Sequence, residues 1–208
     1  MDALSELAEK FHTDKGLKHH GYTPHYHRHL QHLRDEIFVL LELGVGGYEY
    51  EDRGGESLRM WDRYFPKAEI HAVDIHKKTM RGRFAIHQGS QDDGTWLTHL
   101  VNTIGSPLVI IDDASHINAL NIASFNILFP LLKSGGIYIC EDIETSYWEK
   151  IYGGSTDIYN LLNGSAANYF LSLYHNMNTD KIPLENRPLP TDIASIHLYR
   201  GTIIIEKA

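Results

Sequence analysis

Short apolar segments alternate with amphipathic segments through most of this chain, and this alternation constrains the fold more than any other feature. Five of the apolar segments are long enough for one buried strand each: 37–43, 69–75, 84–87, 108–111 and 137–140. Several segments between them have helical spacing: 57–65, 93–102 and 119–132. Because consecutive parallel strands need a crossover, this order predicts a parallel sheet with helices on both faces.

The last two apolar segments depart from this order. Residues 193–199 and 202–205 are separated only by Arg200 and Gly201. So short a connection predicts a β-hairpin, in which one strand runs antiparallel to the other. The sequence therefore predicts an α/β, Rossmann-like fold with a seven-stranded, mostly parallel sheet and a terminal β-hairpin.

We expect one compact domain overall. Residues 1–36 are predicted to form N-terminal helices and a loop that covers the cofactor or substrate, and residues 37–208 to form the α/β domain. Thr23 is predicted to be the N-cap of a helix because Pro24 follows it. An insertion is expected at about 143–192. It is predicted to hold an active-site loop at 145–154, a helix at 159–174 and a surface loop at 176–191.

Composition narrows the functional classes. The chain is 42% hydrophobic and 22% charged, as is usual for a globular domain. Its net charge of −8 argues against a nucleic-acid partner, because nucleic-acid-binding proteins usually have a basic face. No apolar stretch approaches the roughly 20 residues that span a bilayer, so no membrane partner is expected. A single cysteine and an N-terminus without a signal-peptide pattern favour a cytoplasmic location.

Acidic residues follow two of the predicted strands. Asp112 and Asp113 come directly after 108–111, with His116 three residues further on, and Glu141 and Asp142 follow 137–140. The carboxyl ends of parallel strands meet at one edge of a sheet, so these side chains are predicted to form one site.

Carboxylate oxygens favour Mg²⁺ or a similar divalent cation, and we predict that Asp113, Glu141 and Asp142 bind it. His116 is a candidate general base for a substrate hydroxyl. For Asp112, the sequence leaves open a helix N-cap, a solvated loop charge or a cofactor contact.

A candidate cofactor site follows the first three strands. The Gly-rich turn at 44–47 would let the backbone approach a ligand closely, and Asp74 could accept hydrogen bonds from ribose hydroxyls. Gln91 and Asp92 could face an adenine. The turn lacks the third glycine of the NAD fingerprint, having Glu49 there, and Asp74 lies further along the chain than the usual spacing of about 20 residues. These departures disfavour NAD.

Several motifs together resemble the metal-dependent O-methyltransferases of macrolide deoxysugars, of the mycinamicin and macrocin type. These motifs are Phe11-His12-Thr13-Asp14-Lys15, Tyr22-Thr23-Pro24-His25-Tyr26, Glu42-Leu43-Gly44-Val45-Gly46-Gly47-Tyr48, Ser57-Leu58-Arg59-Met60-Trp61, Gly89-Ser90-Gln91-Asp92, Ile111-Asp112-Asp113-Ala114-Ser115-His116, and Glu141-Asp142 with Thr145-Ser146-Tyr147-Trp148. The resemblance implies the class I fold of S-adenosylmethionine (SAM)-dependent methyltransferases. Ala114 stands where the family is expected to have Gly.

The resemblance also implies roles for single residues. It places Mg²⁺ on Asp113, Glu141 and Asp142 and makes His116 the general base. The residues implied to bind SAM are Thr13, Glu42, Gly44, Gly46, Ser57, Asp74, Gln91, Asp92, Asp112 and Asp113. Tyr147 and Trp148 are candidates for stacking on the apolar face of a sugar.

The predicted function is SAM- and Mg²⁺-dependent methylation of a sugar hydroxyl, on a deoxysugar of an antibiotic-type natural product or on a bacterial glycan. A catechol-type O-methyltransferase acting on a planar diol would use the same metal chemistry and remains open. Two other classes are an NAD-dependent oxidoreductase and a non-catalytic nucleotide-binding protein. The expected partner is a small sugar or glycoside, and the N-terminal helix pair could pack between subunits of a homo-oligomer.

Overall fold

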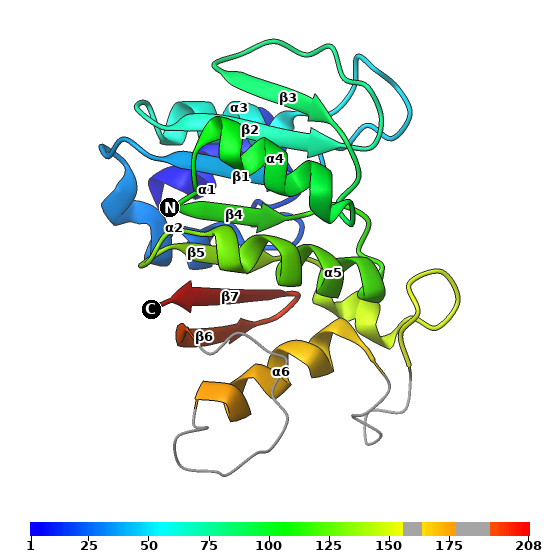
Figure 1. Cartoon of the computed structure of the whole chain (residues 1–208). Coiled ribbons are helices and arrows are strands. Elements are labelled where there is room, and N and C mark those ends of the chain that lie inside the picture. The colour runs from blue at the N-terminus through cyan, green and yellow to red at the C-terminus, as the bar shows by residue number, and fades with distance from the viewer. Residues whose placement is uncertain (156–163, 178–191) are drawn as a thin grey trace. The chain divides into compact units, whose positions relative to one another are not determined.

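The structure is a computed structural model that describes residues 1–155, 164–177 and 192–208 (Figure 1). The chain divides into two compact units, the first from Met1 to Ser90 and the second from Gln91 to Ala208. Each unit combines parallel strands with helices, as the alternating sequence pattern predicts.

The first unit contains three strands that pair in the order β3-β2-β1, all parallel. Helix α3 packs on β2, and α1 packs on both α2 and α3. The core includes Trp61, Tyr64 and Phe65, with the Trp61 and Phe65 rings stacked at 6.0 Å between centroids. The elements are α1 (Ala3–Phe11), α2 (Thr23–Leu30), the 3-10 helix η1 (Gln31–Leu33), β1 (Val39–Leu43), α3 (Glu56–Tyr64), β2 (Glu69–Asp74) and β3 (Phe84–Gln88).

The described part of the second unit contains four strands in the order β4-β5-β7-β6. Strands β4 and β5 are parallel, whereas β7 is antiparallel to both β5 and β6. Helix α5 packs against α4 and α6. The elements are α4 (Gly94–Ile104), β4 (Val109–Asp112), α5 (Asn118–Leu128), η2 (Phe129–Leu131), β5 (Ile137–Cys140), η3 (Ile143–Tyr147), α6 (Ala166–Met177), β6 (Ile193–Tyr199) and β7 (Thr202–Lys207).

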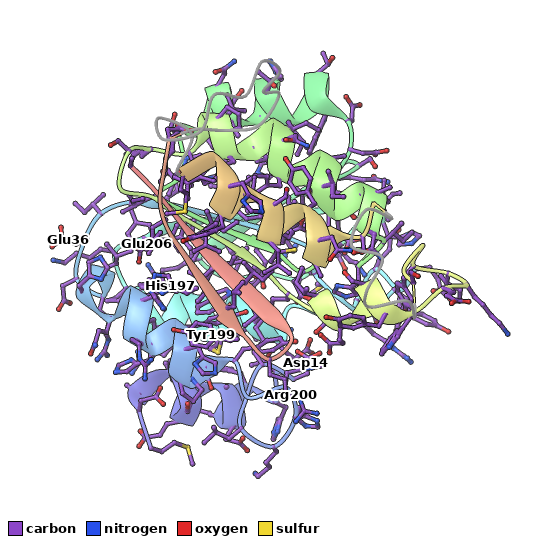
Figure 2. The ribbon with its side chains drawn as sticks, turned by 90° about the horizontal axis from the view of Figure 1, so that it is seen from below. Asp14, Glu36, His197, Tyr199, Arg200 and Glu206 are labelled. Atoms are coloured by element: carbon purple, nitrogen blue, oxygen red, sulfur yellow. The ribbon has the colours of Figure 1, made fainter. Side chains whose placement is uncertain are left out.

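Strands β6 and β7 form the predicted terminal hairpin. His197 on β6 and Glu206 on β7, both labelled in Figure 2, lie close together, with His197 Nε2 3.6 Å from Glu206 Oε1. The Ser195 hydroxyl donates to Glu206 Oε2 at 2.7 Å and lies 2.9 Å from His197 Nε2. This polar cluster and the backbone ladder together join the two strands.

Most boundaries agree with the sequence predictions, but two details differ. Thr23 is the first residue of α2 and not its N-cap, which is Tyr22; the Thr23 hydroxyl instead lies 2.8 Å from Ser5 Oγ. The helix predicted over 119–132 ends at Leu128 and continues as a 3-10 turn, because Pro130 has no N–H for an α-helical bond.

Parts of the predicted insertion, 159–163 of its helix and 178–191 of its loop, lie outside the described residues. The helix that the structure describes there, α6, continues to Met177, so residues 176 and 177 are helical and not part of the loop as predicted. The domain boundaries at 36 and 37, and the cytoplasmic location, stay predictions. In the described part of the chain, no helix has the length and apolar character needed to cross a bilayer.

Candidate active site

Three of the predicted site residues converge in the second unit. Asp113 follows β4 and Asp142 follows β5, and these strands are parallel neighbours with Asp112 and Cys140 in register. One potential ligand atom from each of Asp113, His116 and Asp142 lies within 4.8 Å of the others. His116 Nε2 is 3.8 Å from Asp113 Oδ1 and 3.4 Å from Asp142 Oδ2. All three side chains are 20–23% exposed, so a ligand can reach them.

The backbone at this cluster is unusual. His116 and Asp142 have φ values of 56° and 53°, in the left-handed region that residues other than glycine rarely adopt. Such conformations cluster at functional sites, where surrounding contacts hold them in place. Thr145 provides contacts to both residues, since its hydroxyl donates to the His116 carbonyl at 2.8 Å and its N–H donates to the Asp142 carbonyl at 3.0 Å.

Glu141, the third predicted metal ligand, has a different environment. It precedes Asp142 at the end of β5, is buried, and donates its backbone N–H to the Asp112 carbonyl at 3.0 Å. Its carboxylate is not among the three groups that converge within 4.8 Å. Glu141 therefore adjoins the cluster, and its role as a ligand stays a prediction.

Asp112 is 1% exposed and lies inside a hydrogen-bond network. Its carboxylate accepts from Ser124 Oγ, from the Tyr138 hydroxyl at 3.0 Å and from Gln91 Nε2 at 3.4 Å. Burial raises the pKa of Asp112 to about 6. Asp112 is thus neither a solvated loop charge nor the N-cap of α5, which is Ile117.

Gln91 links this network to the loop that carries Asp113 and His116. Its Oε1 accepts from the Ser115 N–H at 3.1 Å, while its Nε2 contacts the Asp112 carboxylate. Ser115 lies between Asp113 and His116, so the Gln91 amide helps to fix the loop that carries both. This supporting role was not predicted from the sequence.

The Gly-rich turn of the first unit has a backbone conformation that requires glycine. Gly44, Gly46 and Gly47 all have positive φ, and a Cβ on Gly47 would lie 2.2 Å from the Arg53 carbonyl oxygen. Asp74 supports the turn, because its Oδ2 accepts from the Val45 N–H at 3.0 Å; its Oδ1 accepts from a second backbone N–H, that of residue 76, at 2.8 Å. The predicted ribose-binding carboxylate therefore also positions the turn.

Other predicted cofactor residues of the first unit are buried. Thr13, Glu42 and Ser57 all have little exposed surface. Lys15 is buried as well, and its Nζ lies 4.0 Å from Glu42 Oε1. Buried charges need partners, so this ion pair ties the predicted covering loop to the end of β1. Lys15 belongs to the Phe11–Lys15 motif, but nothing in the sequence pattern indicated that its side chain would be buried beside Glu42.

The remaining predicted residues are more exposed. Asp92 lies in an exposed turn before α4. Tyr147 and Trp148, at the end of η3, are 49% and 51% exposed, and the Trp148 ring makes an edge-on contact with Tyr152 at 5.4 Å. A cavity of about 410 Å³ in the first unit is lined in part by four arginines and by none of the predicted site residues.

The chain is similar in sequence to known sugar O-methyltransferases. No family model matches the chain. L-olivosyl-oleandolide 3-O-methyltransferase of Streptomyces antibioticus is 42% identical over 210 residues, which cover 96% of this chain and 53% of that protein. The 8-demethyl-8-alpha-L-rhamnosyl tetracenomycin-C 2'-O-methyltransferase of Streptomyces olivaceus is 34% identical over 210 residues, which cover 100% of this chain and 55% of that protein.

A solved structure agrees with these relatives. The MycE methyltransferase of the mycinamycin biosynthetic pathway, in complex with Mg, SAH and mycinamycin VI, matches with a TM-score of 0.92 and 36% identity. The match covers 99% of this chain and 53% of that chain, so the chain spans about half the length of each of these three proteins. The predicted fold and resemblance are confirmed: the chain is a homologue of the macrolide and tetracenomycin sugar O-methyltransferases and has the class I methyltransferase fold.

Proposed function

We propose that this protein is a SAM-dependent, divalent-cation-dependent O-methyltransferase that methylates a hydroxyl of a sugar in a glycoside. The observation that carries the proposal is the convergence of Asp113, His116 and Asp142 at the carboxyl ends of β4 and β5. Homology to sugar O-methyltransferases supports the reaction and the acceptor class. Because the chain spans about half of each relative, activity of this chain alone needs its own test.

The donor set at the cluster fits a hard cation. Asp113 and Asp142 offer partly exposed carboxylate oxygens, which Mg²⁺ prefers over softer ligands. Glu141 follows the same strand as Asp142 and would complete the set of three acids. MycE, which has 36% identity, was solved with Mg and SAH. When bound, the cation would supply positive charge that acidifies an acceptor hydroxyl.

The Gly-rich turn fits the methyl donor. Gly44 and Gly46 present backbone without side chains, and Asp74, which already holds Val45, keeps its carboxylate partly exposed. The other residues proposed to bind SAM are Thr13, Glu42 and Ser57 in the first unit and Gln91, Asp92, Asp112 and Asp113 in the second. When bound, SAM would supply an electrophilic methyl group and leave as S-adenosylhomocysteine (SAH).

His116 is positioned to move the proton. Its Nε2 faces the two carboxylates, and its Nδ1 is buried with no hydrogen-bond partner among the residues that the structure describes. A neutral imidazole with its proton on Nδ1 would use Nε2 to take the proton that the acceptor hydroxyl loses as its oxygen is methylated. Asp113 and Asp142 would stabilise the imidazolium that results.

Tyr147 and Trp148 could form part of the acceptor site. Each has about half of its surface exposed, so both rings are accessible to a ligand. Such rings can stack on the apolar face of a sugar. A planar diol would stack on the same rings, so the rings fit both acceptor classes and the assay decides between them.

The first experiment is calorimetric titration of the full chain with SAH and, separately, with NAD, each with Mg²⁺ and with EDTA. Binding of SAH without binding of NAD is expected. Transfer of a labelled methyl group from SAM is then measured with mycinamicin VI, methyl α-L-rhamnopyranoside and catechol. Methylation of a sugar that EDTA abolishes supports the proposal; absence of SAH binding, or methylation of catechol only, overturns it.

His116→Ala tests the general base. Turnover is expected to fall by about 10²–10⁴-fold, the usual contribution of general base catalysis, while SAH affinity stays the same. His99→Ala, which removes an exposed histidine on α4, is the matched control and should leave turnover unchanged. Turnover of His116→Ala equal to that of the control would end the role of His116 as base.

A further inference from the structure

A buried asparagine joins several segments around the candidate active site. Asn118, the first residue of α5, is 1% exposed. Its Nδ2 donates to the Tyr152 carbonyl at 2.7 Å and to the Thr145 carbonyl at 3.4 Å. Its Oδ1 accepts from Ser146 Oγ at 2.8 Å and from the Ala166 N–H at 2.6 Å. A side-chain amide has two donors and two acceptor sites, and Asn118 uses all four.

These partners surround the exposed aromatic residues. Thr145 and Ser146 immediately precede Tyr147 and Trp148, and Tyr152 follows them. Besides its side-chain bonds, Asn118 donates its own backbone N–H to the Tyr152 carbonyl at 3.0 Å. The same side chain therefore anchors both ends of the short segment that carries the two aromatic rings.

The segment is also closed on itself. The Gly154 N–H donates to the Trp148 carbonyl at 3.0 Å, and the Ser155 N–H donates to the Ser146 carbonyl at 2.9 Å. A Cβ on Gly154 would lie 2.3 Å from the Ser146 carbonyl oxygen, so only glycine allows this close approach. Segment 145–155 is thus a compact loop whose base rests on Asn118.

The exposed rings depend on this base for their positions. Because about half of each of the Tyr147 and Trp148 side chains lies outside the core, burial of the rings cannot fix the loop. The loop is instead tied to the cluster by Asn118, two residues after His116, and by the hydrogen bond from Thr145 to the His116 carbonyl. The aromatic loop and the general base are consequently held by one set of buried hydrogen bonds.

We propose that Asn118 is a positioning residue that holds segment 145–152, as a wall of the acceptor site, in a fixed place relative to His116. The proposal rests on the proposed function. It assigns Asn118 to acceptor binding and not to the binding of SAM or metal. A wall that packs on the acceptor binds its ground state and transition state alike, so loss of the wall should raise the acceptor KM more than it lowers kcat.

The structural part of the proposal is tested by limited trypsin digestion of the full chain. Lys150 is the only lysine or arginine between residues 134 and 155, so cleavage after it reports on this loop. Asn118→Ala is expected to accelerate cleavage after Lys150 by about tenfold or more, because the protease cuts segments that have opened locally. Mass spectrometry of the fragments measures the rate of this cleavage. Asn126→Ala is the control on the same helix, since among the described residues the exposed Asn126 side chain accepts one bond, from the Tyr169 hydroxyl.

Ser146→Ala provides a milder variant in case Asn118→Ala does not fold. It removes one of the four bonds to Asn118 and the bond that Ser146 Oγ accepts from the Ala167 N–H. Circular dichroism identifies variants that keep the fold. If folded Asn118→Ala is cleaved after Lys150 no faster than the wild type, Asn118 does not anchor the loop and the proposal fails. If Asn118→Ala does not fold, the same comparison is made with folded Ser146→Ala.

The functional part is tested by the split between KM and kcat with mycinamicin VI and methyl α-L-rhamnopyranoside. Asn118→Ala is expected to raise the acceptor KM by about tenfold or more and to leave SAH affinity within about twofold. Faster cleavage at Lys150 with an unchanged acceptor KM would overturn the assignment to acceptor binding. A wild-type chain that transfers no methyl group would contradict the proposed function, and the digestion would still decide whether Asn118 anchors the loop.

Discussion

Tyr138→Phe tests how far the buried carboxylate of Asp112 depends on the hydroxyl groups around it. Tyr138 is fully buried on β5 and donates its hydroxyl to Asp112 Oδ2 at 3.0 Å. Ser124 Oγ donates to the same oxygen, and Gln91 Nε2 lies 3.4 Å from the other. The substitution keeps the ring and its edge-on contact with Phe125, so the hydrogen bond is the main loss.

The magnitude follows from the charge of the acceptor. Burial raises the pKa of Asp112 to about 6, which leaves the carboxylate ionised at neutral pH. A hydrogen bond to a charged group contributes about 1.5–3 kcal/mol, so Tyr138→Phe is expected to lower the free energy of unfolding by about 2 kcal/mol. Urea unfolding of the chain at about pH 7.5, followed by circular dichroism, measures this quantity.

Tyr169→Phe is the matched control. The Tyr169 hydroxyl donates to the neutral Asn126 Oδ1 at 2.6 Å in an exposed position, so its loss should cost about 1 kcal/mol or less. A loss for Tyr138→Phe no larger than that for Tyr169→Phe would refute the reasoning, because it would mean that the other donors around Asp112 suffice.

Two further predictions concern the first unit. Gly47→Ala should lower the free energy of unfolding in urea by about 2 kcal/mol or more, because a left-handed φ of 75° is combined with contact between the new Cβ and the Arg53 carbonyl. Gly21→Ala is the control: Gly21 has a φ of 71° but open space around it, so only the backbone strain of about 1 kcal/mol is expected. Equal losses of unfolding free energy in the two variants would contradict this reasoning. Burial, with His71 nearby, lowers the pKa of His87, so folding disfavours its protonation and stability should fall as pH drops through the unfolded-state value of about 6.5. His87→Gln should lose less unfolding free energy than the wild type between about pH 7.5 and about pH 5.5, and equal losses would refute the role of His87.

The sheet could be predicted because its signals are local. Four apolar residues between a Gly pair and two acids define β5 at 137–140, and the two-residue connection after Tyr199 defines the hairpin. The convergence of Asp113 and Asp142 followed from the same reasoning, since the carboxyl ends of neighbouring parallel strands must lie side by side. The position of Pro130 could also have shown where α5 ends.

The hydrogen-bond partners of buried polar residues could not be predicted. The Thr23 hydroxyl meets Ser5, and Asn118 meets Ala166, across separations in the chain that no periodic pattern encodes. Lys15 gives the same lesson, because a lysine in a polar loop is usually solvated, and here it is buried beside Glu42. Such contacts depend on how the elements pack, whereas sequence patterns specify mainly which face of each element is apolar.

Exposure distinguishes Asp113, His116 and Asp142 from Asp112 at the carboxyl ends of β4 and β5. Asp113, His116 and Asp142 are partly exposed, and two of them hold left-handed backbone conformations that cost of order 1–3 kcal/mol each. Asp112 is buried and fully engaged within the protein, where it supports the loop through Gln91. Substitution of Asp113, His116 or Asp142 should therefore reduce activity while preserving or raising stability. Substitution of Asp112 or Gln91 should reduce stability first.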